Sequence, residues 1–254
     1  MKRNVGCGVH LGITLRVMMD QNCWKGFMNE GVELIIFDCD GVLIDSESVS
    51  SRVEAEELRR HGCDITVEAY LEIALGLSEE EEIWGRIAAE HGVQLPPDFV
   101  TTIRAQVAEA FKNELQPIPG IREVLSKLDT PICVASGSRL ERVRRCLTLA
   151  GLAEFFADNI FSASEVERGK PDPALFLYAA AKMGADPARC MVVEDSPPGV
   201  QGAKAAGMTV LGFLGATHHI PGLPEKLLDS GSAAIFDDMR QFPALCQKFQ
   251  ATME

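Results

Sequence analysis

The chain has 254 residues, of which 46% are hydrophobic and 24% are charged, a composition that is ordinary for a globular protein and excludes a disordered or fibrous class. Its net charge of −13 disfavours a large nucleic-acid interface, because phosphate contacts on that scale need a basic face. No run approaches the roughly 20 apolar residues that span a bilayer, so we expect no membrane segment.

The eight cysteines are spread along the chain, with no Cys-x-x-Cys pair and no ligand-like arrangement with the five histidines. Several fall inside predicted strands or helices, where a free cysteine packs as a small hydrophobic residue. We therefore expect reduced, mostly buried cysteines and a reducing compartment, the cytoplasm.

Residues 1–32 are predicted to be a leader that is disordered or partly ordered. Lys2 and Arg3 precede a modestly apolar stretch, which imitates a signal peptide, but glycines interrupt that stretch and no small-x-small cleavage site follows. The segment is basic whereas the rest of the chain is acidic, and Met28 comes just before the first strong strand. A leader, or a translation start placed too early, fits these features better than an export signal.

From residue 33 onward, short apolar runs alternate with stretches whose apolar residues recur every three or four positions. This alternation is typical of a parallel β-sheet with crossover helices. We therefore expect an α/β fold with a doubly wound, Rossmann-like core. The predicted strands are 34–38, 132–136, 160–162, 191–195, 209–213 and 234–236.

One long segment interrupts the alternation between Asp45 and about Pro117. It contains no convincing strand and is predicted to form several helices, two of which end at glycines. An insertion directly after the first strand lies above the carboxyl ends of the sheet, where open α/β sheets bind ligands. We therefore divide the chain into a core at 33–48 and 118–254 and a helical cap at 49–117.

The first strand leads into two carboxylates, Asp38 and Asp40, that flank a single residue before Gly41. Carboxylates at the end of a buried strand are unfavourable unless a cation holds them. Mg²⁺ prefers oxygen ligands, so it could take the carboxylate of Asp38 and a backbone carbonyl from Asp40. The alternative is that Asp40 and Gly41 form only a turn and that Asp38 caps the strand end.

Three later strand ends carry polar residues that suit the same chemistry. The Ser-Gly-Ser segment at 136–138 precedes a helix, where a hydroxyl and backbone N–H groups can meet an anion. Lys170 lies between a glycine and a proline, which suits a fixed positive charge, and Glu194 with Asp195 forms a second acidic pair. Each feature alone has a simpler interpretation, namely a helix-entry turn, a surface lysine and a helix cap.

Together, these four motifs resemble those of the haloacid dehalogenase-like hydrolase superfamily, and the resemblance covers nearly everything from residue 33 onward. Residues 38–41 are similar to the DxDG motif, the strand ending in Ser136 to the serine motif, Lys170 to the lysine of the GKPDP motif, and 194–199 to the EDS-x-x-G acidic motif. The most similar branch carries a helical cap after the first motif. It contains phosphoglycolate phosphatases, sugar-phosphate phosphatases and β-phosphoglucomutases.

The resemblance implies a Mg²⁺-dependent phosphatase that hydrolyses a small phosphomonoester through an aspartyl phosphate. Mg²⁺ and a lysine would neutralise the charge that spreads over the phosphoryl group in the transition state. The general acid/base would need a raised pKa to protonate the leaving oxygen. The implied roles are nucleophile for Asp38, general acid/base for Asp40, phosphate binding for Ser136, Gly137 and Lys170, and metal ligation for Asp38, Asp40, Asp195 and Glu194.

The partner implied is a small phosphorylated metabolite, with no nucleic acid or membrane, bound by a monomer or weak homodimer. A phosphomutase of the β-phosphoglucomutase type uses the same Asp38 chemistry, so it stays the enzymatic alternative. A phosphate-binding or receiver-like module is the non-enzymatic alternative. Segment 75–78 of the cap is expected to face the substrate, and His218 with His219 is expected in a surface loop.

Two positions depart from the family pattern. Val42 stands where the family usually has a threonine, which removes one hydroxyl, and two prolines at 197–198 stiffen the loop of the acidic motif. Neither change removes a catalytic group.

Overall fold

The computed structural model of the protein describes residues 31–74, 80–215 and 222–250. The predicted leader up to residue 30, the segment 75–78 and the loop with His218 and His219 lie outside the described residues. Within them, no helix is long and apolar enough to cross a membrane.

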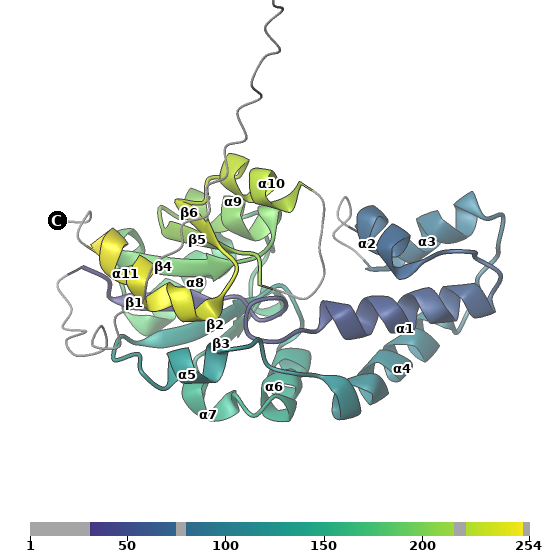
Figure 1. Ribbon diagram of the computed structural model, residues 1–254, viewed down its shortest axis with the longest axis horizontal. Helices are drawn as coiled ribbons and strands as arrows, with labels where there is room; N and C mark the ends of the chain where they lie inside the picture. Colours follow the sequence, from purple (N-terminus) through teal and green to yellow (C-terminus); the bar gives the residue numbers. More distant parts are fainter. Residues whose placement is uncertain (1–30, 75–79, 216–221, 251–254) are drawn as a thin grey trace, which may run out of the picture.

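A six-stranded parallel sheet forms the core, with the order β3-β2-β1-β4-β5-β6 (Figure 1). Two crossovers in opposite directions from β1 produce this order, which is the doubly wound arrangement expected from the sequence. β1 therefore lies in the middle of the sheet, at the point where the strand order reverses. The strands are β1 (Leu34–Phe37), β2 (Ile132–Ser136), β3 (Ile160–Ser162), β4 (Cys190–Glu194), β5 (Thr209–Phe213) and β6 (Ala234–Phe236).

Two strands end one residue earlier than predicted, β1 at Phe37 and β4 at Glu194. Asp38 and Asp195 therefore follow their strands directly and belong to the loops at the carboxyl edge. The N–H of Asp38 still donates to the carbonyl of Val193 at 3.0 Å, so the backbone of Asp38 stays fixed to the sheet.

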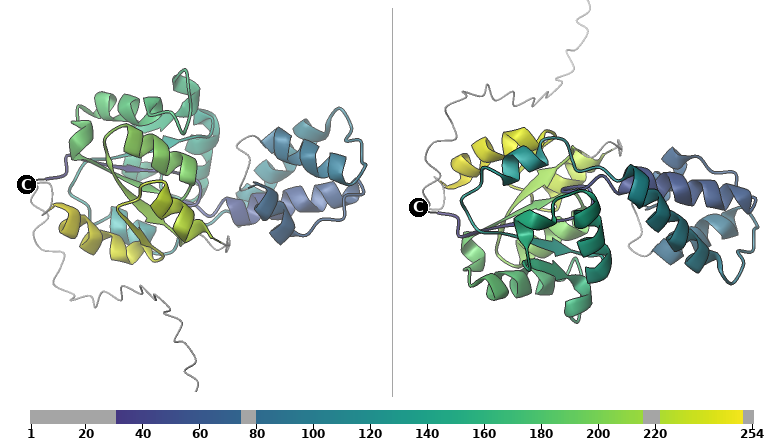
Figure 2. Two further views of the ribbon diagram at one scale, coloured as in Figure 1. Left: turned by 90° about the horizontal axis from the view of Figure 1, so that it is seen from above. Right: turned by 90° about the horizontal axis from the view of Figure 1, so that it is seen from below.

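Helices cover both faces of the sheet, as Figures 1 and 2 show. Alternate residues of β1 enter two separate apolar clusters, Ile35 and Phe37 on one face and Leu34 and Ile36 on the other. A strand buried on both faces reads as a continuous apolar run, which explains its strong signal in the sequence. The first face is covered by α5 (Ile121–Leu125), α6 (Leu140–Leu149), α7 (Ala153–Phe156) and α11 (Phe242–Gln250), and the second by α8 (Ala174–Met183), α9 (Pro197–Ala205) and α10 (Leu223–Asp229).

Short 3₁₀ turns complete the core connections, and an aspartate caps one of them. The side chain of Asp238 accepts a hydrogen bond from the N–H of Arg240, at the start of the turn that follows β6. The turns are η1 (Ala163–Glu165), η2 (Pro187–Arg189) and η3 (Met239–Gln241).

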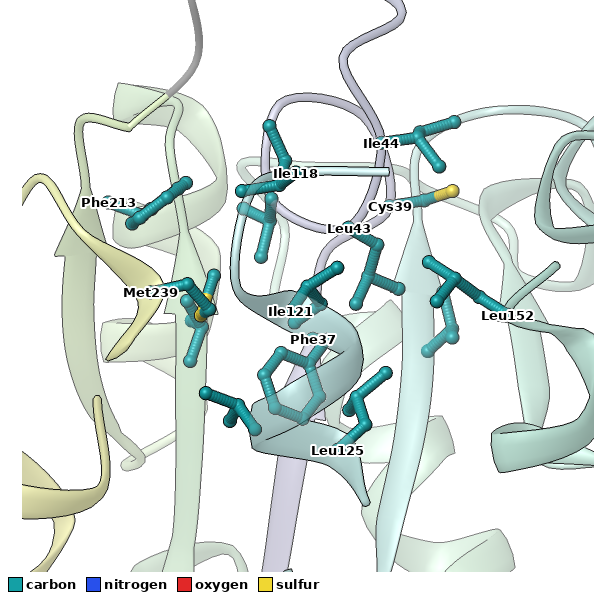
Figure 3. Packing of buried hydrophobic residues seen from close by; sticks show 14 of the residues in the cluster. Phe37, Cys39, Leu43, Ile44, Ile118, Ile121, Leu125, Leu152, Phe213 and Met239 are labelled. Atoms are coloured by element: carbon teal, nitrogen blue, oxygen red, sulfur yellow. The ribbon is translucent and has the colours of Figure 1, made fainter. Parts of the chain in front are cut away.

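The first apolar cluster continues to the carboxyl edge of the sheet (Figure 3). Ile121 and Leu125 of α5 pack over Phe37 at the end of β1, and Leu43 of the following loop lies next to them. All four side chains are at most 4% exposed. This packing makes the loop after β1 a rigid support for the two aspartates that it carries.

In the described residues, the first four helices after β1 form a separate cap beside the sheet (Figure 1). They bury their own apolar cluster, centred on Trp84, Ile87 and Ile103. Two chain segments join the cap to the core, and they pair through a bridge between Ile44 and Pro117. The helices are α1 (Glu47–Arg60), α2 (Val67–Ala74), α3 (Glu80–Glu90) and α4 (Phe99–Glu114).

The cysteines in the described residues fit the expectation of reduced, buried thiols. All six are free and buried.

Candidate active site

The loop after β1 is a tight turn that places Asp38 and Asp40 at the centre of the carboxyl edge. The N–H groups of Leu43 and Ile44 both donate to the carbonyl of Cys39, at 3.0 and 3.2 Å. Gly41 adopts a positive φ of 73°, and a side chain there would collide with the carboxylate of Asp195. Glycine is therefore required at this position for both the turn and the approach of Asp195.

Three of the predicted acidic residues converge at this edge from β1 and β4. Asp38, Glu194 and Asp195 each offer a carboxylate oxygen, and these oxygens lie within 4.8 Å of one another. The ammonium group of Lys170 reaches the same place, with Nζ 2.7 Å from Oδ1 of Asp38 and 2.5 Å from Oε1 of Glu194. The structure thus brings Lys170 to the first motif across 132 residues of sequence.

Burial dominates the electrostatics of this cluster. Removal from water raises the pKa of Asp38 to about 7, although the ammonium of Lys170 opposes the shift. Burial, together with the charges of Glu47, Glu194 and Asp38, raises the pKa of Asp195 well above its usual range. Burial alone would lower the pKa of Lys170, but the two carboxylates in contact with it raise that pKa instead. Three carboxylates facing one ammonium thus leave the cluster short of positive charge.

Glu194 is held more firmly than the other two acids. Its side chain is fully buried, and Oε2 accepts hydrogen bonds from both the N–H and the hydroxyl of Ser196 at 2.9 Å. A side chain at Gly199 would collide with this carboxylate, which explains the glycine of the acidic motif. With its other oxygen on Lys170, Glu194 is better placed to fix that ammonium than to bind a metal directly.

The serine motif forms a turn at the end of β2. Ser136 is buried, and its hydroxyl accepts a hydrogen bond from the N–H of Ser138 at 3.1 Å. Gly137 is exposed, and a side chain built there would meet open space. The hydroxyl of Ser162, at the end of β3, donates to the carbonyl of Ser138 at 2.6 Å and so fixes the turn from the neighbouring strand.

Asp40 lies in surroundings that the sequence did not predict. Its carboxylate makes contacts of 2.7 and 3.0 Å with Nη1 of Arg142 and accepts hydrogen bonds from Ser138 at 2.9 Å and Ser46 at 2.5 Å. Burial would raise the pKa of Asp40, but the charge and hydrogen bonds of Arg142, with those of the two serines, lower it to about 2. The raised pKa that a general acid needs is absent from this arrangement, because a cation is paired with the carboxylate.

Sequence reasoning gave no role to Arg142, Ser46 or the Ser138 hydroxyl. Arg142 follows Ser138 by four residues, but Ser138 precedes Arg139, the N-cap of α6, so helical spacing does not predict their contact. The contact with Asp40, which spans 102 residues, has no counterpart in local sequence.

The acidic cluster fits a divalent cation such as Mg²⁺. Its donors are hard carboxylate oxygens, which Mg²⁺ prefers. Any side chain at residue 41 would collide with the carboxylate of Asp195, so the glycine leaves room for that carboxylate. The Asp40 carboxylate lies outside this cluster of oxygens. If Asp40 contributes a ligand, the contribution comes from its backbone carbonyl, as the sequence indicated.

Comparison with known proteins places the chain among the haloacid dehalogenase-like hydrolases. The sequence model of that family matches residues 32–207, and the chain belongs to the family. The 6-phosphogluconate phosphatase of Escherichia coli K12 is 32% identical over 215 residues, which are 84% of this chain and 94% of that protein. Hexitol phosphatase B of the same organism is 33% identical over 68% of this chain and 79% of its own length.

Among solved structures, a haloacid dehalogenase-like protein from Agrobacterium tumefaciens superposes with a TM-score of 0.80 and 37% identity, covering 86% of this chain and 99% of that one. The resemblance inferred from the four motifs is thus confirmed. The expectation of a phosphoric monoester hydrolase agrees with the phosphatase names of the two sequence relatives.

Proposed function

We propose that this protein is a Mg²⁺-dependent phosphatase of small phosphorylated sugars or polyols and that it acts through an aspartyl phosphate on Asp38. The observation that carries the proposal is the buried contact of 2.7 Å between Lys170 and Asp38, beside the carboxylates of Glu194 and Asp195. A nucleophilic carboxylate, a fixed ammonium and a set of metal-binding oxygens are together the parts that phosphoryl transfer to an aspartate requires.

In the first step, a carboxylate oxygen of Asp38 attacks phosphorus, a new O–P bond forms and the ester P–O bond breaks. Asp40 first leaves its ion pair with Arg142 and takes a proton from water; it then gives that proton to the leaving oxygen, which departs as an alcohol. Lys170, Ser136 and the N–H groups around Gly137 bind the phosphoryl oxygens and offset their growing negative charge. In the second step, water attacks phosphorus, Asp40 accepts its proton, and the bond to Asp38 breaks to give inorganic phosphate.

Mg²⁺ held by Asp38, Asp195 and the backbone carbonyl of Asp40 would supply the positive charge that the cluster lacks, so that an anionic ester can approach an anionic nucleophile. We assign Glu194 the separate task of holding Lys170. The Ser196 contacts on its second oxygen support this division, because they leave Glu194 little capacity for a metal.

The names of the two curated relatives support a polyhydroxylated substrate, since one acts on 6-phosphogluconate and the other on hexitol phosphates. We place the cap at 49–117 and the core at 33–48 and 118–254, so that the cap would cover such a substrate and exclude water during transfer. We further propose a cytoplasmic enzyme that works as a monomer or weak homodimer.

The test is steady-state phosphate release from a panel of sugar, hexitol and sugar-acid phosphates, with and without Mg²⁺, for wild type and Asp38→Asn. We expect release that needs both Mg²⁺ and Asp38, with the sugar and polyol esters having the highest kcat/KM. Conversion of a hexose 1-phosphate to its isomer without phosphate release would contradict the proposal and favour a mutase. Release that persists in Asp38→Asn would overturn the role of Asp38.

A further inference from the structure

The carboxylate of Asp40 is occupied on both oxygens. Oδ1 accepts from Ser46 and Arg142, and Oδ2 accepts from Ser138 and Arg142. The guanidinium also donates to the Ser138 hydroxyl at 2.6 Å, so the arginine, the serine and the carboxylate form a closed triangle of hydrogen bonds. A carboxylate in this arrangement has few lone pairs left for a leaving oxygen or a water molecule.

Two of the residues that contact Asp40 connect it to the cap. Ser46 occupies the N-cap position of α1, yet its hydroxyl makes no hydrogen bond to the helix and donates instead to Asp40. The guanidinium of Arg142 lies over the ring of Phe111 on α4, with 5.5 Å between its central carbon and the ring centroid. The ring is buried at 1% exposure, so the arginine bridges the core site and the base of the cap.

The contact between arginine and ring is a part of the packing between cap and core. Helices α4 and α6 lie against each other, and they carry Phe111 and Arg142 respectively. A cation over an aromatic face is attracted to it, so the position of α4 affects the energy of the guanidinium. The same guanidinium therefore takes part both in the packing of α4 on α6 and in the ion pair with Asp40.

We propose that Arg142 is a positioning residue that restrains Asp40, and that Phe111 makes this restraint dependent on the position of the cap. The inference rests on the proposed phosphatase function, in which Asp40 must turn an oxygen toward the ester. Opening the ion pair is then part of the barrier to proton transfer. Arg142 itself exchanges no proton and touches no reacting atom.

The restraint affects substrates unequally. The leaving group of an alkyl phosphate is a strongly basic alkoxide oxygen, so it needs the proton of Asp40. The leaving group of p-nitrophenyl phosphate is a weakly basic phenolate, which departs with little need for a proton. The informative quantity is the ratio of kcat/KM for an alkyl ester to kcat/KM for p-nitrophenyl phosphate. A purely structural role for Arg142 would lower both values together and leave the ratio unchanged.

The experiment measures this ratio for wild type, Arg142→Met and Arg142→Lys, using the sugar or polyol phosphate that wild type hydrolyses fastest. Methionine keeps an unbranched side chain over Phe111 and removes the charge and the donors. We expect the ratio to rise about fivefold in Arg142→Met, the scale of one partly exposed ion pair, and less in Arg142→Lys, which keeps the charge. A ratio that falls or stays at the wild-type value would overturn the restraint.

Two further variants complete the design. Arg145→Met removes an exposed arginine from the same helix and should leave the ratio at the wild-type value. Phe111→Leu removes the ring but keeps the ion pair, and we expect a smaller rise in the ratio. An unchanged ratio in Phe111→Leu would overturn the link to the cap. Thermal unfolding identifies any variant that fails to fold. If Arg142→Met fails to fold, Arg142→Lys and Phe111→Leu still test the proposal.

Failure of the proposed function has a different signature. If wild type releases no phosphate, or if Asp38→Asn releases as much as wild type, the phosphatase proposal itself is wrong. If wild type depends on Asp38 and the ratio does not rise in Arg142→Met, only the role of Arg142 is wrong.

Discussion

Asp38 and Asp40 are separated by a single residue, yet their carboxylates lie in opposite electrostatic surroundings. Asp38 is buried beside two other acids, and its pKa is raised to about 7. Asp40 is paired with Arg142, and its pKa is lowered to about 2. The difference matches a division of roles. Asp38 shares one ammonium with Glu194 and still needs the positive charge of a metal, whereas Asp40 is already paired with an arginine.

The assignment of Asp40 as acid/base predicts the behaviour of Asp40→Asn. An amide cannot transfer the proton, so kcat for sugar phosphates should fall about 10²- to 10⁴-fold. Binding should survive, because the change leaves Lys170 and the serine motif in place. Competition by inorganic phosphate or vanadate measures binding separately from turnover. Turnover of alkyl esters at the wild-type rate in Asp40→Asn would exclude the assignment.

The raised pKa of Asp38 predicts how Mg²⁺ stabilises the protein at different pH values. Folded Asp38 binds a proton up to about pH 7, whereas an unfolded aspartate releases it near about pH 4, so this group makes the metal-free protein less stable as pH rises through that window. Mg²⁺ relieves the repulsion among ionised carboxylates and competes with protons for them. Its stabilising effect should therefore be larger at about pH 8 than at about pH 5.

Thermal unfolding with and without Mg²⁺ measures this effect. At a hundredfold excess over the Kd, Mg²⁺ should add about 2.7 kcal/mol to the free energy of unfolding. Asp195→Asn should lose most of the gain, because it removes one ligand. An equal gain at both pH values, or a full gain in Asp195→Asn, would show that Mg²⁺ binds elsewhere. Asp40 does not complicate this window, since its lowered pKa affects stability only below about pH 4.

At the scale of elements, the sequence predicts the positions of the strands well, but it predicts only some of the residues that meet at the site. Strands buried on both faces give continuous apolar runs, so β1, β2 and β4 are evident from the sequence alone. Lys170 and the acidic pair were found because each follows a strand or adjoins a distinctive glycine and proline. Arg142 was missed because it lies inside an amphipathic helix, where an arginine is ordinary and only the packing of α6 gives it a partner.

The pKa of Asp40 could not be predicted from the sequence for the same reason. A general acid needs a raised pKa, but the pKa depends on which charges the fold brings nearby, and the relevant charge comes from 102 residues away. Nothing in the sequence distinguishes Arg142 from Arg139, the arginine that precedes it. Arg139 is exposed, whereas Arg142 forms an ion pair with Asp40.

The turn after β1 gives a prediction for a single element. Gly41→Ala should displace Asp195, because the added methyl group would occupy the place of its carboxylate. We expect the stabilisation by Mg²⁺ to be lost and the free energy of unfolding to fall by about 1–3 kcal/mol. Gly92→Ala is the matched control, since Gly92 also has a positive φ, of 66°, but nothing lies within 4 Å of an added methyl group.

Comparing these two variants separates backbone strain from the collision. Gly92→Ala should lose some stability and keep the full response to Mg²⁺. A Gly41→Ala protein that retains the Mg²⁺ response would show that Asp195 is dispensable for the metal.

At the scale of the whole molecule, the cap and the core bury separate apolar clusters. The cap cluster contains Trp84, Ile87 and Ile103, and none of the core cluster residues belongs to it. Units with separate cores and two connecting segments can open independently of each other. This independence is what a cap needs if it admits substrate and then excludes water.

Hydrogen exchange tests the independence. Ile87→Ala truncates a fully buried side chain of the cap and should destabilise the cap by about 2–5 kcal/mol. We expect faster exchange in α1–α4 and unchanged protection in β1, β2 and β4. Val192→Ala, in the sheet, is the counterpart that should increase exchange in the core strands. Faster exchange throughout the core in Ile87→Ala would mean that the two units unfold together.

The central claim is that a phosphoryl group passes through Asp38, and trapping it there is the most direct measurement. The enzyme is quenched in acid during turnover of its best substrate with Mg²⁺, reduced with borohydride and mapped by mass spectrometry. The account predicts a modified residue at Asp38 in wild type that is absent from Asp38→Asn and from samples without Mg²⁺. Turnover with no modification at Asp38, or modification at another residue, would contradict it.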